Sequence, residues 1–116
     1  MATAAQCQRA VDYLVHRLAD LPLETRRRHA PDRSLTIEVT DLGLAYVGRM
    51  EQGELVEVGC VPLPVAGEPA QVRLALSSDD LVALADGVLS LSSAWASGKL
   101  RVDASVLDMV RLRALL

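Results

Sequence analysis

The chain has 116 residues, of which 51% are hydrophobic, and its formal net charge at pH 7 is -3. This length predicts a single domain over residues 1–116, and the hydrophobic content argues against disorder. The acidic balance argues against nucleic-acid binding, because no basic helix or aromatic stacking platform accompanies it. No apolar run approaches the ~18 residues that span a bilayer, and the N-terminus is too polar for a signal peptide, so we expect a cytoplasmic protein.

The first predicted element is an amphipathic helix over residues 4–20. Apolar side chains recur there every three or four residues, and charged side chains occupy the rest of the helical wheel. The next segment, residues 20–33, contains two prolines and a basic run without periodicity, which predicts a loop. The basic run, residues 26–29, suits contact with anionic lipid head groups, and a solvated loop is the alternative.

Strands follow the loop. Apolar and polar residues alternate over residues 34–41, which predicts a half-buried strand. Its apolar face consists of Leu35, Ile37 and Val39. Residues 44–50 and 54–60 flank a short connection that contains a glycine, and we expect them to form a hairpin. A Pro/Gly-rich loop then leads to a fourth strand over residues 71–77, whose inward side chains are Val72, Leu74 and Leu76.

The periodicity changes to that of a helix at Ser77. Residues 77–80 have a spacing like that of a capping box, and the short helix that they open is expected to end at Gly87. Ser90 caps a second short helix, which ends at Gly98 where the chain reverses direction. The sequence therefore places two short helices after the fourth strand.

The chain closes with a fifth strand over residues 99–103 and a final helix that Ser105 caps. One helix, four strands, two short helices, a strand and a helix follow each other in this order. The order predicts an α+β fold in which a single mixed five-stranded sheet is covered on one face by helices.

The final helix has two apolar faces, whereas a helix that lies on a sheet needs one. The first face, expected to lie on the sheet, consists of Val106, Leu107, Val110 and Ala114. The second consists of Met109, Leu112 and Leu116. The second face needs a contact of its own: a neighbouring helix, a partner chain, a bilayer surface or an apolar ligand.

Motifs of catalysis and metal binding are missing from the sequence. Cys7 and Cys60 have no metal-ligand spacing, and we interpret both as small buried hydrophobic residues. His16 and His29 have no carboxylate or nucleophile pattern near them, and the serines lack the spacing of a nucleophile elbow. We therefore expect neither a metal, nor a cofactor, nor an enzyme.

Residues 80–116 resemble the C-terminal half of the sterol carrier protein family, the type-two sterol-transfer domain. Three segments carry the resemblance: Asp86-Gly87-Val88-Leu89, Ala94-Trp95-Ala96-Ser97-Gly98-Lys99-Leu100 and the helix that ends in Leu115-Leu116. The chain departs from the family where Ala104-Ser105 replaces the usual Gly-Asp. Trp95 is expected either to anchor the core or to form the wall of a pocket.

The resemblance implies a sterol-carrier-like sandwich that binds and transfers an apolar lipid, such as a sterol, fatty acid or acyl-CoA, without chemistry. The expected ligand-binding residues are apolar side chains of the sheet and of its helical cover: Leu35, Ile37, Val39, Leu74, Leu76, Leu81, Leu84, Leu91, Trp95, Leu107 and Val110. Transient contact with a membrane surface would accompany uptake. Two alternatives are an interaction module with a filled cavity that forms a homodimer, and an isomerase or cyclase that uses the same pocket.

Overall fold

The computed structural model describes residues 1–25 and 32–115, apart from the side chains of residues 112 and 115. The elements agree in type and order with those predicted. They are α1 (Ala4–Ala19), β1 (Arg33–Val39), β2 (Leu44–Glu51), β3 (Glu54–Pro62), β4 (Val72–Leu76), α3 (Ser78–Ala85), α4 (Leu91–Ala96), β5 (Arg101–Asp103) and α5 (Val106–Leu115).

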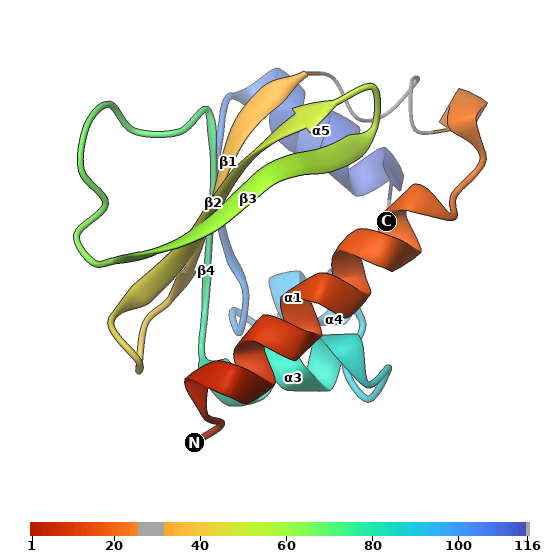
Figure 1. The fold of residues 1–116 in the computed structure, drawn as a ribbon. Helices are drawn as coiled ribbons and strands as arrows, with labels where there is room; N and C mark the ends of the chain where they lie inside the picture. The colour runs from red at the N-terminus through yellow and green to blue at the C-terminus, as the bar shows by residue number, and fades with distance from the viewer. Residues whose placement is uncertain (26–31, 116) are drawn as a thin grey trace.

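The strands form one mixed sheet in the order β3-β2-β1-β4-β5. Strands β1 and β4 are parallel, and the other neighbouring pairs are antiparallel. The helices lie on one side of the sheet, and the connection between β3 and β4 lies on the other (Figure 1). The predicted α+β fold with helices on a single face is confirmed. We call the side that the helices cover the helix-facing side and the other the loop-facing side.

The register assigns each strand residue to one of these sides. Ile37 pairs with Tyr46 on β2 and with Leu74 on β4, so the three side chains share the helix-facing side. Two residues further along both strands, Val39 pairs with Leu76 on the same side of the sheet. The inward faces predicted for β1 and β4 are therefore correct.

A tight turn joins β2 to β3. Gln52 and Gly53 have φ angles of 51° and 77°, the left-handed conformation that a two-residue hairpin of type I′ requires. The backbone N–H of Gln52 donates to Asp32 Oδ1 at 2.9 Å, which ties the turn to the residue before β1. The predicted hairpin is confirmed.

The start of α3 is fixed by two side chains. Ser77 accepts a hydrogen bond from the backbone N–H of Asp80, as predicted for its cap. The carboxylate of Asp41 accepts from the Ser78 backbone N–H at 2.8 Å and from the Ser78 hydroxyl at 2.6 Å. The Ser78 hydroxyl, and less strongly its backbone N–H, lowers the pKa of Asp41 below 3.8. The loop after β1 is thereby attached to the helix layer.

The predictions for the loop before β1 and for one face of β1 differ from the structure. Residues 23–25 are helical where a loop was expected, and the basic run 26–29 lies outside the described residues. Thr36, placed by alternation on the solvent side of β1, is only 5% exposed. It lines a cavity together with Pro64 and Val65 of the β3–β4 connection, so this connection covers part of the loop-facing side.

Candidate functional site

The predicted ligand-binding residues occupy three environments. Four are buried in the core: Val39, Leu76, Leu81 and Leu84. Four are half-buried: Leu35, Ile37, Leu74 and Trp95. Three are exposed: Leu91, Leu107 and Val110. The structure therefore brings together the sheet residues of the predicted site. Three residues of the predicted helical cover, Leu91, Leu107 and Val110, lie at the surface instead.

The core closes one end of the helix-facing side. Val39 and Tyr46 pack there with Leu81 of α3 and Ala94 of α4, and all four are at most 3% exposed. Helix α1 contacts both α3 and β3 and contributes the buried Val11 to the same cluster. Packing of this kind leaves no surplus apolar surface at this end of the sheet.

The other end of the same side is covered less completely. Leu35, Ile37, Leu74 and Val102 are neighbours through the strand registers, and each stays half-buried. We call these four residues the half-buried patch. Opposite Leu35 on β2 stands Gly48, and the side chains of Leu55 and Val58 on β3 occupy the space that a Cβ at Gly48 would need.

The helices near this end are also incompletely packed. Leu18 of α1 and Met109 of α5 are half-buried and lie outside the core cluster. A further apolar group would remove more surface from water beside a half-buried apolar side chain than in the closed core. Ile37, Leu74 and Val102 also pack against the core cluster, so the patch is a partly covered margin of the core.

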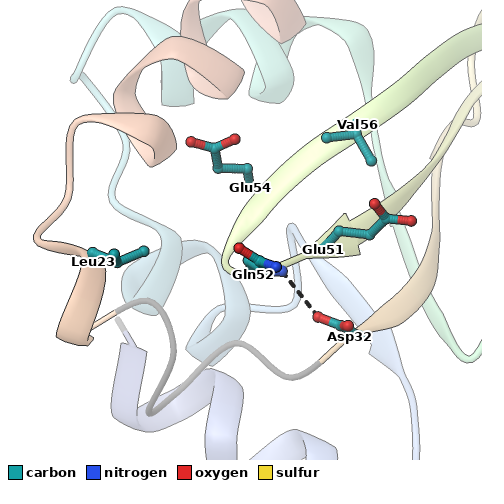
Figure 2. Close-up of a pocket in the computed structure, with 6 residues that line it drawn as sticks. All are labelled: Leu23, Asp32, Glu51, Gln52, Glu54 and Val56. Atoms are coloured by element: carbon teal, nitrogen blue, oxygen red, sulfur yellow. Dashed lines mark hydrogen bonds between the residues drawn. The ribbon is translucent and has the colours of Figure 1, made fainter.

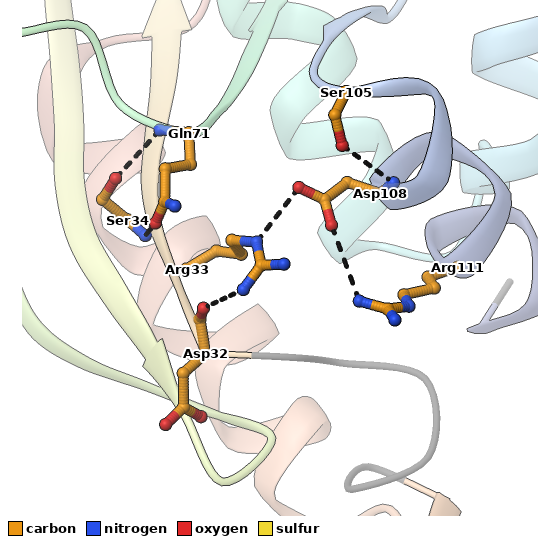
Figure 3. Close-up of polar contacts among 7 residues, drawn as sticks. All are labelled: Asp32, Arg33, Ser34, Gln71, Ser105, Asp108 and Arg111. Carbon is orange, nitrogen blue, oxygen red and sulfur yellow. Dashed lines mark hydrogen bonds and ion pairs between the residues drawn. The ribbon is translucent and has the colours of Figure 1, made fainter.

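A polar cluster borders the patch at the start of β1 (Figure 3). The Arg33 Nε atom donates to Asp108 Oδ2 of α5 at 3.1 Å, and Arg33 Nη1 donates to the Asp32 carbonyl oxygen at 2.7 Å. Arg111 Nη1 lies 3.9 Å from Asp108 Oδ1. The predicted cap is present too, since Ser105 Oγ accepts from the Asp108 backbone N–H. The buried carboxylate of Asp108 thus ties α5 to the sheet.

This ion pair helps to hold α5 in an orientation that differs from the prediction. The predicted sheet-facing residues Val106, Leu107, Val110 and Ala114 are exposed, and Asp108 is buried in their place. Apolar periodicity alone does not reveal that a carboxylate will find an arginine 75 residues away. Of the second apolar face, Met109 is half-buried, and the side chains of Leu112 and Leu116 lie outside the described residues.

Trp95 is half-buried against the core and also contacts α5. The guanidinium carbon of Arg113 lies 5.5 Å from the centre of the Trp95 ring, a distance that allows a cation–π contact. Gly98 follows with a φ of 81°, which confirms the predicted reversal. This position agrees with the prediction that Trp95 anchors the core. That Trp95 also forms the wall of a pocket stays a prediction.

Burial favours the neutral forms of two titratable side chains in the core, Tyr46 and Cys7. Burial raises the pKa of Tyr46 to about 12, with smaller contributions from Cys60, Cys7 and Asp12. Burial also raises the pKa of the Cys7 thiol. Cys7 is buried as predicted, whereas Cys60 is exposed. Among the described residues no group of three or more His, Cys, Asp or Glu side chains could hold a metal ion.

Two cavities lie in the described part of the structure, and one of them shares Leu35 with the half-buried patch. One, of about 290 Å³, is lined by Leu23, by Asp32 and by residues of the β2–β3 hairpin (Figure 2). The other, of about 540 Å³, lies between the sheet and the β3–β4 connection. Leu35 is the one predicted ligand-binding residue in either lining. The proline-rich stretch after β3 was the sequence signal for this second cavity, and it was interpreted only as a loop.

Within the described part of the chain, no helix combines the length and the apolar character needed to cross a membrane.

The fold defines the class of the protein, an α+β domain of the sterol-carrier type. Residues 15–116 match the SCP-2 sterol transfer family, and the chain belongs to this family. The resemblance found in the C-terminal half therefore extends over nearly the whole chain. No curated protein sequence matches the chain closely enough to count as a relative.

Solved structures share this fold. A sterol carrier protein 2 superposes with a TM-score of 0.66 at 16% identity, over 97% of this chain and 88% of that one. Sterol carrier protein 2 of Aedes aegypti in complex with palmitate gives a TM-score of 0.57 at 18% identity, over 98% and 96% of the two chains. A sec-alkylsulfatase from Pseudomonas sp. gives 0.56 at 22% identity over 85% of this chain, which spans only 15% of that enzyme.

Proposed function

We propose that the chain binds a single-chain lipid, such as a fatty acid, on the helix-facing side of its sheet and releases it unchanged. The observation that carries this proposal is the contiguity of the half-buried patch, formed by Leu35, Ile37, Leu74 and Val102 beside a fully closed core. Membership in a sterol-transfer family supports it. So does the palmitate bound to the sterol carrier protein of Aedes aegypti.

The driving force is burial of the lipid chain. Each methylene removed from water contributes about 0.8 kcal/mol, so about ten methylenes would supply roughly 8 kcal/mol before the costs of association. The costs of association reduce this figure, so the dissociation constant for ten buried methylenes is weaker than the micromolar value that a net gain of about 8 kcal/mol would give. Neutral Tyr46 and Cys7 lie in the adjacent core and place no charge against the chain.

Entry of the lipid requires α5 to move. The described side chains that fix α5 are polar: Asp108 binds Arg33, and Arg113 contacts Trp95. Its large apolar side chains Val106, Leu107 and Val110 are exposed. Among the described side chains of α5, Met109 is the only half-buried large apolar one. Moving the helix therefore disrupts little of the apolar packing that the structure describes, and exchange of the lipid without covalent chemistry is feasible. We therefore also propose that the chain acts as a carrier and not as an enzyme.

Titration with palmitate, followed by the fluorescence of the single tryptophan Trp95, tests the proposal. Ile37→Thr makes the patch more polar, and Val47→Thr is its matched control on the loop-facing side, where Val47 lines the second cavity. We expect Ile37→Thr to weaken binding about fivefold or more through lost apolar contact, and Val47→Thr to leave it unchanged. Circular dichroism establishes that both variants are folded.

The outcomes separate the alternatives. If the wild-type chain does not bind palmitate, other fatty acids or sterols up to their solubility limits, the proposed function is refuted. If Val47→Thr weakens binding and Ile37→Thr does not, the lipid occupies the cavity under the β3–β4 connection, and the helix-facing site is wrong.

A further inference from the structure

An exposed apolar stripe runs along α5. Val106 is 80% exposed, Leu107 57% and Val110 61%, and Ala114 is exposed as well. At about 100° per residue these four side chains fall within an arc of roughly 100° on the helical wheel. Large aliphatic side chains that are gathered on one exposed face indicate an interaction surface, unlike single exposed ones.

Arginines border this stripe on both sides. On the wheel, Arg111 lies about 40° beyond one margin of the stripe and Arg113 about 20° beyond the other. Arg111 is partly exposed, and the exposed Arg113 reaches across to the ring of Trp95. A helix with an aliphatic face and flanking cations suits the boundary between acyl chains and anionic head groups.

Negative charge on α5 does not oppose such a contact. Asp108 is the only acidic residue in the helix, and it is buried, on the side away from the stripe, and paired with Arg33. Asp103 lies just before the helix and forms an ion pair with Arg73. The net charge of -3 is thus carried by residues outside α5.

The stripe is small for an interface between two copies of the chain. Its three large side chains expose roughly 300 Å² of apolar surface, whereas a stable interface buries about 800 Å² per partner. A bilayer requires no matching contour and accepts a narrow aliphatic stripe together with its flanking arginines.

We propose that the exposed face of α5 docks the protein on the surface of an anionic lipid bilayer. Val106, Leu107 and Val110 enter the acyl boundary, and Arg111 and Arg113 contact the head groups. The docked helix is the one that must move for a lipid to reach the half-buried patch. Docking and lipid binding use different residues, so each can be measured without the other.

Co-sedimentation with vesicles tests this surface. We expect the wild-type chain to bind vesicles of phosphatidylglycerol mixed with phosphatidylcholine, to bind pure phosphatidylcholine much less, and to be released by salt. The double variant Leu107→Ser with Val110→Ser should lose about tenfold or more in partitioning. Val88→Ser is the matched control, because Val88 is 83% exposed on the turn after α3. We expect it to bind as the wild type does.

A second variant isolates the electrostatic contribution. Arg111→Gln with Arg113→Gln should remove most of the preference for anionic vesicles and most of the salt dependence. The proposal is overturned if the wild type ignores anionic vesicles, or if Val88→Ser loses as much binding as the α5 variant. It is equally overturned if light scattering shows a wild-type dimer that the α5 variant converts to a monomer, since the stripe would then hold two copies together.

Discussion

Replacing Asp108 by asparagine tests how α5 is attached to the sheet. The substitution keeps the shape of the side chain and removes the charge that faces Arg33 at 3.1 Å. Breaking a fully buried ion pair costs about 3–5 kcal/mol and breaking an exposed one about 0–1 kcal/mol. Here the side chain of Asp108 is 8% exposed and that of Arg33 29% exposed. We therefore expect Asp108→Asn to lower the free energy of unfolding by about 2 kcal/mol, between these limits.

Urea unfolding at neutral pH measures this difference, and for a domain of this size thermal unfolding should show a decrease in Tm of roughly 6–10 °C. Asp103→Asn is the matched control, because Asp103 pairs with Arg73 at the surface and its side chain is 70% exposed. We expect the control to cost less than about 1 kcal/mol. Equal losses in the two variants would show that the Asp108 contact contributes no more than a surface ion pair, and its assigned role in holding α5 would be wrong.

Three further predictions concern the core and the start of α3. A thiol reagent should modify Cys60 in the native protein and Cys7 only after unfolding, because Cys7 is fully buried and burial raises its pKa; equal rates would refute the closed core. Because the pKa of Asp41 is lowered from 3.8 in the folded state, its contribution to stability is present above about pH 4 and is lost as pH falls through the folded-state pKa. Asp41→Asn should therefore be less stable than the wild type at pH 7 and lose less on acidification, as pH-dependent urea unfolding can establish. Leu81→Ala, at a residue 2% exposed, should cost about 3 kcal/mol, whereas Leu107→Ala should change stability by less than about 0.5 kcal/mol in the same assay.

Much of the fold could be predicted because local chemistry determines it. Alternation placed Ile37 and Leu74 on the same side of the sheet, and glycines marked the hairpin and the reversal at Gly98. Ser77 and Ser105 cap α3 and α5 as their spacing predicted. Turns, caps and periodicity depend on neighbours within a few residues, so one sequence reveals them.

Features that depend on distant residues were not predicted. Apolar periodicity placed Leu107 toward the sheet, but the pairing of Asp108 with Arg33 helps to hold that face of α5 outward. Alternation placed Thr36 in solvent, but the β3–β4 connection folds over it. In each case a long-range contact outweighs a local pattern.

The candidate site was predicted in part for the same reason. Its sheet residues follow from strand alternation, and the structure brings Leu35, Ile37 and Leu74 together on the helix-facing side. Which of the apolar residues are buried in the closed core and which stay half-buried depends on how the helices cover the sheet. That coverage is a property of tertiary packing, and no spacing in the sequence encodes it.

The most direct test of lipid binding on the helix-facing side uses Ile37, the only isoleucine in the chain. Isotope-filtered NOE spectra of labelled protein with unlabelled palmitate report which methyl groups lie close to the lipid chain. We predict contacts from the palmitate methylenes to the Ile37 δ-methyl group and none to Val61 or Val65, which line the cavity on the loop-facing side. Contacts to Val61 and Val65 without any to Ile37 would contradict the proposed site.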